Sequence, residues 1–379
     1  MEYTKLKYIN QYKSKSINPA KTPDTIFEMY SVPIYATGHP EYLRGDEIAS
    51  NKAIVRKNDI LLCKINPRIN RVWVVSDESG KQNIASSEWI VIRNSEYNPE
   101  FLAWYFRTPK FQKFMTSEIT GIGGSLTRAQ PKCVAEYPVP VLNRKKQDEI
   151  VNILDKCKFV IDSRKRELLE LDNIIKARFV EMFGSIHEST GYPYLALKDL
   201  SDVISGGTPS RGKAEFWNNG TIPWVKTTEL KNNVITDVDE YITEEGLVNS
   251  SAKLVPAGTI LVAMYGQGKT RGMTAYLDIE ASTNQACACI LPSDKIDSMF
   301  MWKYFELSYD KLRILAQGAG QPNLNGNMIK NFKVLVPPIE MQKSYVNFVN
   351  QVDKSKVKVQ KALDETQKLF DSLMQQYFG

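Results

Sequence analysis

The segment from Lys64 to Arg71 places cationic and amide side chains at close spacing. Lys64, Arg68 and Arg71 can neutralise phosphates, while Asn66 and Asn70 carry the paired donor and acceptor that match a base edge. These residue types suit contact with a nucleic acid. An ordinary solvated loop is the alternative interpretation for any one of them taken singly.

Other segments are also rich in Lys, Arg, Asn, Gln, Ser or Thr, and most of them contain glycine, which lets a backbone approach a phosphate closely. These segments are 37–39, 86–87, 123–128, 205–213, 226–228, 265–271 and 320–323. The full set of candidate DNA contacts is Lys64, Asn66, Arg68, Asn70, Arg71, Ser125, Arg128, Gly206, Gly207, Thr208, Ser210, Arg211, Lys213, Lys226, Thr227, Tyr265, Gln267, Lys269, Arg271, Gln321 and Asn323.

Residues 266–270 read Gly-Gln-Gly-Lys-Thr and end like a phosphate-binding P-loop. That pattern requires a glycine five positions before Gly268, where Ala263 stands. We therefore predict a turn rather than a nucleotide site, with Lys269 and Arg271 available to neutralise phosphate charge.

Catalytic motifs are missing from the chain. There is no Asn-Pro-Pro-Tyr-like methyltransferase motif, no GxGxxG after a strand and no metal-nuclease signature. His39 and His187 are the only histidines, which leaves little for acid–base or metal chemistry, and both are expected at the surface. The sequence therefore predicts a non-catalytic chain that holds neither a metal nor a cofactor.

Composition limits the class of protein. In 379 residues, 49 basic side chains oppose 43 acidic ones, and the net charge of +6 is compatible with a polyanionic partner without requiring one. The five cysteines form no CxxC pair and are expected to be reduced thiols. No run of eighteen apolar residues exists and the first residues are polar, so we expect a soluble, cytoplasmic protein without a membrane span.

The elements that would hold these residues are duplicated. Residues 147–184 align without a gap with residues 342–379, at a constant offset of 195 that takes Gln147 to Gln342 and Gly184 to Gly379. Both copies end in Phe-Gly, which is typical of a helix that stops at a glycine. Looser matches precede each copy, because 6–9 resembles 197–200, 57–62 resembles 257–262 and 101–106 resembles 300–305.

Within each copy, apolar residues recur in alternating steps of four and three, the period of a coiled-coil seam. Neither copy contains proline or an internal glycine. The predicted seam residues are Ile150, Leu154, Ile161, Leu168, Leu171, Ile175, Val349, Val352, Val359, Leu363, Phe370 and Leu373. About 35 residues of helix span on the order of 50 Å, which is long enough for a spacer. A pair of long core helices in a globular domain is the alternative.

Each region before a helix is predicted to be a mixed α+β domain. Strands are indicated at 60–62, 73–75, 89–92 and 286–291, and amphipathic helices at 101–114 and 298–315. Trp217 and Trp224 are interpreted as core or loop anchors rather than base-stacking platforms. The predicted division is a first domain at 1–143, a helix at 144–184, a second domain at 185–337 and a helix at 338–379.

Several motifs of the second half follow one another in the order found in one protein family. They are Ile204–Ser210 (ISGGTPS), Trp217-Asn218, Ile222–Val225, Gly258–Leu261, Thr283–Gln285 and, before the second helix, Val336–Gln342. The chain resembles the specificity subunits of type I restriction-modification systems over essentially its whole length. The first half departs from the pattern, since GGTPS has no counterpart near Ile9. Thr283–Gln285 could equally be a structural turn.

The resemblance implies two target-recognition domains in tandem, each followed by a long helix, with the helices packed as an antiparallel coiled-coil spacer. Each domain would read one half of a bipartite, asymmetric DNA target. The implied partners are double-stranded DNA, two adenine-N6 methyltransferase subunits and optionally restriction subunits, with S-adenosylmethionine bound by the methyltransferase. Two alternatives remain at this point: a self-contained restriction or methylation enzyme with unrecognised motifs, and a coiled-coil scaffold for protein interactions.

Overall fold

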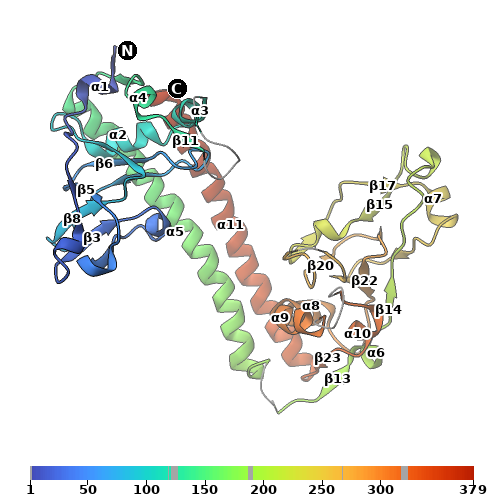
Figure 1. Cartoon of the computed structure of the whole chain (residues 1–379). Helices are drawn as coiled ribbons and strands as arrows, with labels where there is room; N and C mark the ends of the chain where they lie inside the picture. Colours follow the sequence, from blue (N-terminus) through green and yellow to red (C-terminus); the bar gives the residue numbers. More distant parts are fainter. Residues whose placement is uncertain (1, 118, 121–126, 187–190, 267, 317–322) are drawn as a thin grey trace. The chain divides into compact units, whose positions relative to one another are not determined.

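Two helices of 40 residues, α5 (Arg144–Phe183) and α11 (Ile339–Phe378), follow the two globular parts of the chain in a computed structural model (Figure 1). The structure describes residues 2–117, 119–120, 127–186, 191–266, 268–316 and 323–379. Its contacts divide the chain into two units. Unit 1 contains residues 1–165 and 361–379, and unit 2 contains residues 166–360.

Most strands of unit 1 lie in a five-stranded and a three-stranded sheet. One has the order β2 (Ser16–Ile17), β5 (Lys52–Ile54), β8 (Gln82–Ala85), β3 (Ile26–Tyr30), β4 (Glu41–Arg44), and the other has the order β7 (Val72–Val74), β6 (Ile60–Cys63), β9 (Trp89–Ile92). Strands β3 and β8 run parallel, and the remaining pairs are antiparallel. One face of β6, β7 and β9 packs on α2 (Pro99–Phe106) and α3 (Pro109–Ser117) in the main core, and the other face belongs to a separate apolar cluster.

Unit 2 repeats this plan with a four-stranded and a five-stranded sheet. One has the order β17 (Tyr241–Ile242), β15 (Ile222–Val225), β21 (Ala281–Thr283), β18 (Leu254–Val255); the other has the order β14 (Val203–Ser205), β22 (Cys287–Ile290), β19 (Ile260–Ala263), β20 (Thr274–Leu277), β16 (Asn233–Ile235). The parallel pair β15–β21 corresponds to β3–β8 of unit 1. Helices α8 (Ser298–Leu307) and α9 (Tyr309–Leu315) cover its main core.

The shorter elements also come in matching sets. In unit 1, β1 (Tyr3–Lys5) pairs with β12 (Pro138–Pro140) before α1 (Leu6–Ile9), and in unit 2, β13 (Tyr194–Ala196) pairs with β23 (Lys333–Leu335) before α6 (Leu197–Leu200). The remaining elements are β10 (Ile119–Thr120), β11 (Arg128–Ala129), α4 (Pro131–Val134), α7 (Glu244–Val248), α10 (Gly326–Lys330) and the 3-10 turns η1 (Pro19–Lys21), η2 (Pro33–Thr37), η3 (Gly45–Glu47), η4 (Ala214–Phe216) and η5 (Thr227–Glu229).

The strand predictions match β6, β7, β9 and β22 to within one residue at both ends of each strand. The two helix predictions are each divided. Residues 101–114 form α2 and α3, because Pro109 lacks an N–H and disfavours a helical conformation at Thr108. In unit 2 no proline is involved, and the chain leaves the helix at Ser308, whose N–H donates to the carbonyls of both Tyr304 and Phe305 at 3.0 and 3.1 Å.

The two long helices run antiparallel within each unit. In unit 1 the start of α5 shares a core with the end of α11, through residues such as Leu154 and Leu373. In unit 2 the end of α5 packs on the start of α11, where the rings of Phe179 and Tyr345 meet edge to face at 5.5 Å. All twelve predicted seam residues are buried or half-buried. The α+β architecture with antiparallel helices is therefore as predicted.

Gly184 ends α5 as expected. Its φ is +80°, a left-handed conformation that glycine adopts without steric cost, and its N–H donates to the carbonyl of Val180 at 2.8 Å. The stop therefore follows from the residue type.

Candidate nucleic-acid interface

The loop after β14, residues 206–213, follows one tightly fixed path. A Cβ atom at Gly206 would collide with Thr283, and one at Gly207 would collide with the backbone of Ser251. The N–H of Gly207 donates to the carbonyl of Thr283 at 2.8 Å. The two glycines are therefore required for close packing against neighbouring loops, and their backbone is held in place.

Two indole rings anchor the same loop through hydrogen bonds to its backbone. The Nε1 of Trp224 donates to the carbonyl of Gly207 at 3.0 Å, and the Nε1 of Trp217 donates to the carbonyl of Ser210 at 3.0 Å. The rings meet edge to face at 5.0 Å. This is the anchoring role predicted for both tryptophans, and it fixes the loop at two points three residues apart.

Arg211 extends from this anchored loop over the indoles. Its guanidinium lies 3.6 Å from the centre of the Trp217 ring and 4.8 Å from that of Trp224, and its Nη1 forms an ion pair with Glu240. Lys226 pairs with the same carboxylate at 2.9 Å and with Asp239 at 3.5 Å. Hydrogen bonds from Arg211 and Lys226 lower the pKa of Glu240, and the bond to Glu240 raises the pKa of Lys226.

The other candidate residues of unit 2 differ in their contacts and in their exposure to solvent. The ammonium group of Lys213 lies 4.7 Å from the Phe216 ring centre, and Thr208 bonds to Gln285. Asn284 occupies a structural turn, since its N–H donates to Val225 at 3.1 Å and its side-chain oxygen accepts from Ala286. Thr227, Asn323 and Arg271 are half-buried, while Tyr265, Ser210 and Lys269 are exposed.

The segment that resembles a P-loop joins two antiparallel strands, β19 and β20. A phosphate-binding P-loop leads into a helix, whose N-terminus contributes to phosphate binding. A hairpin offers no such N-terminus, which agrees with the predicted turn. The turn is tied down by the hydroxyl of Tyr309, which donates to the carbonyl of Lys269 at 2.7 Å, and by Arg313, which donates to the carbonyl of Arg271 at 3.2 Å.

The cation-rich segment of unit 1 occupies the equivalent position, joining β6 to β7 in a hairpin. Arg68 is exposed at its tip, while Lys64 and Asn66 are half-buried. Two of its side chains are used inside the fold: Asn70 donates to the carbonyl of Phe106 at 2.9 Å, and the Nη1 of Arg71 lies 3.9 Å from the sulfur of Cys63. The hairpin therefore presents fewer free groups than its composition suggests.

Arg128 lies beside this hairpin and is fixed by a carboxylate. Its Nη2 and Nε donate to the two oxygens of Glu88 at 3.1 and 3.2 Å. The hydrogen bond to Glu88 raises the pKa of Arg128, whose side chain is 42% exposed. Both units thus contain a half-exposed arginine that is oriented by a glutamate.

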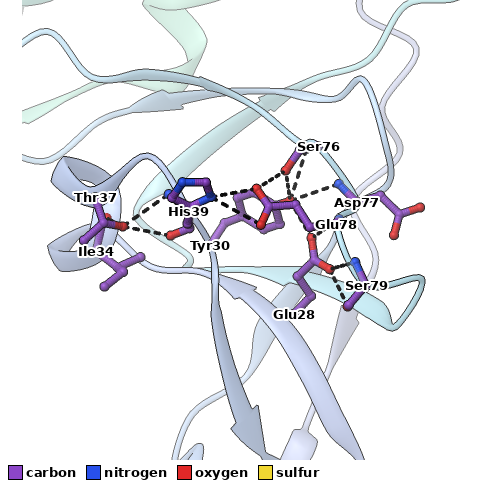
Figure 2. A network of polar contacts seen from close by, with 9 residues as sticks. All are labelled: Glu28, Tyr30, Ile34, Thr37, His39, Ser76, Asp77, Glu78 and Ser79. Atoms are coloured by element: carbon purple, nitrogen blue, oxygen red, sulfur yellow. Dashed lines mark hydrogen bonds and ion pairs between the residues drawn. The ribbon is translucent and has the colours of Figure 1, made fainter.

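A buried carboxylate organises a further loop of unit 1 (Figure 2). Glu28 accepts hydrogen bonds from the hydroxyl of Tyr30 at 2.8 Å, from the N–H groups of Glu78 and Ser79 at 2.9 and 2.8 Å, and from the hydroxyl of Ser79. Burial by itself raises the pKa of Glu28, but the hydrogen bonds outweigh it and lower the pKa below its ordinary value. His39 is exposed, as expected, with its Nδ1 3.1 Å from Glu78 (Figure 2).

Three candidates, Ser125, Gln267 and Gln321, lie outside the described residues, as does His187. The carboxylates Glu28, Glu88 and Glu240 were not predicted. Each is distant in sequence from the group it orients, so no local pattern marks it. Among the described residues there is no cluster of His, Cys, Asp and Glu that could hold a metal ion, and no helix there is long and apolar enough to cross a membrane.

The chain is similar in sequence to DNA specificity subunits of restriction enzymes. The profile of the type I restriction modification DNA specificity domain matches residues 191–366, from just before β13 into α11. Over 213 residues the chain is 28% identical to the specificity subunit of the type I restriction enzyme EcoR124I/EcoR124II from Escherichia coli, covering 55% of this chain and 52% of that relative. It is 24% identical over 383 residues to the MjaVIII specificity subunit of Methanocaldococcus jannaschii, covering 92% of this chain and 84% of that relative.

The chain is similar to the specificity subunits of type I restriction-modification systems. The match to the Escherichia coli specificity subunit spans about half of that relative's length. The fold agrees with that of solved structures: the S subunit from M. genitalium superimposes with a TM-score of 0.61 at 13% identity, covering 100% of this chain and 96% of that one. A chain from a solved type I R-M system gives the same TM-score at 18% identity, covering 100% and 97%.

Proposed function

We propose that this chain is the DNA-recognition subunit of a type I restriction-modification complex, and that each of its two globular domains reads one half of a bipartite, asymmetric target. The observation that carries the proposal is the duplication: the two globular parts share the same core strands, the same parallel strand pair and the same attachment to a 40-residue helix. Two similar but non-identical readers suit a target with two different halves.

The loops support this function through their chemistry. In both units a hairpin that follows equivalent strands, 64–71 and 264–273, carries Lys and Arg, and in both a half-exposed arginine is oriented by a glutamate. Unpaired cations suit phosphate contacts, which provide affinity, while oriented side chains suit base edges, which provide specificity. Affinity for DNA should therefore fall steeply with salt.

The chemistry of modification is assigned to partners in this proposal. The partners are two adenine-N6 methyltransferase subunits, with restriction subunits optional, and the methyltransferase binds the S-adenosylmethionine. The specificity subunit itself holds no cofactor and is not catalytic. We further propose that the complex acts on DNA in the cytoplasm.

The proposed functional division follows the sequence boundaries, with recognition domains at 1–143 and 185–337. The helices at 144–184 and 338–379 would set the distance between the two half-sites and dock the methyltransferases. The continuity of α5 and α11 over 40 residues each supports a spacer role.

A reconstitution experiment tests the proposal. The purified methyltransferase subunit is assayed on a DNA library with and without this chain, and methylated positions are determined by sequencing. Methylation of one bipartite sequence should depend on the chain. Specific methylation that persists without it would contradict the proposal, as would methyl transfer by the chain alone or DNA affinity that is insensitive to ionic strength.

A further inference from the structure

We propose that Arg211 reads a guanine in the half-site bound by the second domain, and that Trp217 and Glu240 are the positioning residues that hold its guanidinium for this contact. The inference rests on the proposed function and adds to it a reader, its base and the groups that orient the reader.

The guanidinium of Arg211 is held in one orientation by its neighbours. The guanidinium of Arg211 lies 3.6 Å from the Trp217 ring centre and pairs through Nη1 with Glu240, so both its plane and one edge are fixed. Among the described residues, Glu240 is the single carboxylate paired with Arg211. The side chain is 52% exposed. An arginine has five N–H donors, so donors remain for an incoming ligand.

The loop that carries Arg211 is itself anchored to the fold. The carbonyls of Gly207 and Ser210, on either side of the Thr208-Pro209 segment, accept hydrogen bonds from two buried or half-buried indoles. Neighbouring loops pack so closely on Gly206 and Gly207 that a Cβ atom at either position would collide with Thr283 or Ser251. A side chain that begins on a fixed backbone loses little conformational freedom on binding, which favours a directional contact to a base edge.

The charges around Arg211 are already balanced by carboxylates. Arg211 and Lys226 pair with Glu240 and Asp239, and the carboxylate of Glu229 lies beside Lys226, so the cluster has no excess of positive charge. A cluster without excess positive charge releases few counterions and contributes little to phosphate binding. Lys213 differs, because among the described residues no carboxylate pairs with it. The cluster is therefore better suited to reading a base, and Lys213 to contacting a phosphate.

Guanine is the base that fits an oriented guanidinium. Its O6 and N7 acceptors in the major groove match two parallel N–H donors, and this pairing is the commonest specific contact of arginine. A lysine at the same position keeps the charge but has neither the planar fork nor the stacking on Trp217. Charge and geometry can therefore be separated by one substitution.

The test uses the full chain with its partner methyltransferase. Sequencing first defines the wild-type target, and methylation rates are then measured on duplexes with each single base-pair change in each half-site. Arg211→Lys should reduce discrimination at one G·C pair of the second half-site by about tenfold or more, while leaving the first half-site unchanged. Glu240→Gln should cause a smaller loss at that same pair only. A purely structural role for Glu240 would change stability or all positions together.

Salt dependence supplies the matched control. Lys213→Ala should reduce the slope of log affinity against log salt by about 0.9 while keeping the sequence preference, whereas Arg211→Lys should keep the slope. A second half-site without a G·C pair would overturn the inference, as would unaltered discrimination in Arg211→Lys. Equal weakening at every sequence in Arg211→Ala would identify a phosphate contact instead. A wild-type complex that methylates no specific sequence would refute the proposed function itself.

Discussion

The side-chain oxygen of Gln342 accepts the backbone N–H of Asp297 at 2.9 Å, while its Nε2 donates to the carbonyl of Pro337 at 2.7 Å. In the other unit Gln147 does the same, accepting from Asn98 at 2.8 Å and donating to Leu142 at 2.7 Å. Both glutamines are buried. Each one ties the first turn of a long helix to the start of the helix that covers the domain core.

Replacing Gln342 with alanine should therefore destabilise unit 2. The change leaves a backbone N–H and a carbonyl without their partner, which costs about 2–4 kcal/mol for the two groups together. Urea unfolding of the full chain, followed by tryptophan fluorescence, measures the free energy of unfolding.

Gln351→Ala, at an exposed position of the same helix, is the matched control and should change stability by less than about 0.5 kcal/mol. Equal effects of the two substitutions would show that the bridge from Gln342 contributes nothing beyond helix propensity.

These glutamines also show which features of the fold can be predicted from the sequence and which cannot. The gapless offset paired Gln147 with Gln342, and the heptad pattern predicted both helices, because apolar periodicity is local and survives low identity. The hydrogen bonds to Asn98 and Asp297 were not predicted, since a partner 45 or 49 residues away leaves no pattern. The break before Pro109 was missed although its signal, a proline, was present.

In the candidate site, too, local features could be predicted from the sequence and long-range contacts could not. Residue types predicted which loops carry cations, but could not predict that Lys226 and Arg211 are already paired with Glu240. Those pairs join strands and loops that meet only in the folded sheet. Net charge at a loop therefore depends on tertiary neighbours that composition does not reveal.

Glu28 predicts a pH dependence of stability in unit 1. Because the pKa of its carboxylate is lower in the folded chain than its ordinary value of 4.5, the network stabilises the fold at pH above about 4.5. This stabilisation is lost as pH falls through the lower folded pKa. Glu28→Gln should lower the free energy of unfolding at pH 7 by about 3 kcal/mol, since a buried charged acceptor of several hydrogen bonds is removed.

The measurement is urea unfolding at pH 7 and at several values below pH 4.5, for the wild type and the variant. The difference between them should shrink as the pH falls. Glu41→Gln, on the neighbouring strand β4 and half-buried, is the control. A difference between Glu28→Gln and wild type that stays constant with pH would mean that the carboxylate is not ionised in the network.

Exchange of residues 185–337 for the corresponding domain of another specificity subunit should change one half of the methylated sequence. The first domain keeps its own core and loops, since every strand pair of unit 1 is formed within residues 3–140. Methylation-aware sequencing of cells carrying the hybrid measures the outcome. A change in both half-sites would show that the two domains do not read independently.

Insertion of one heptad in α5 after Lys165 and one in α11 after Gln360 should lengthen the gap between half-sites. Both positions lie between the two units, and seven residues preserve the seam register of each helix. Seven residues add about 10.5 Å of helix, which corresponds to about three base pairs. The sequenced target of the variant should keep both half-sites and differ only in the gap.

Insertion in α5 alone is the control, because it offsets one seam against the other and should abolish specific methylation. An unchanged gap in the double insertion would contradict the spacer role, since the half-sites would then be held at their distance by something other than the helices.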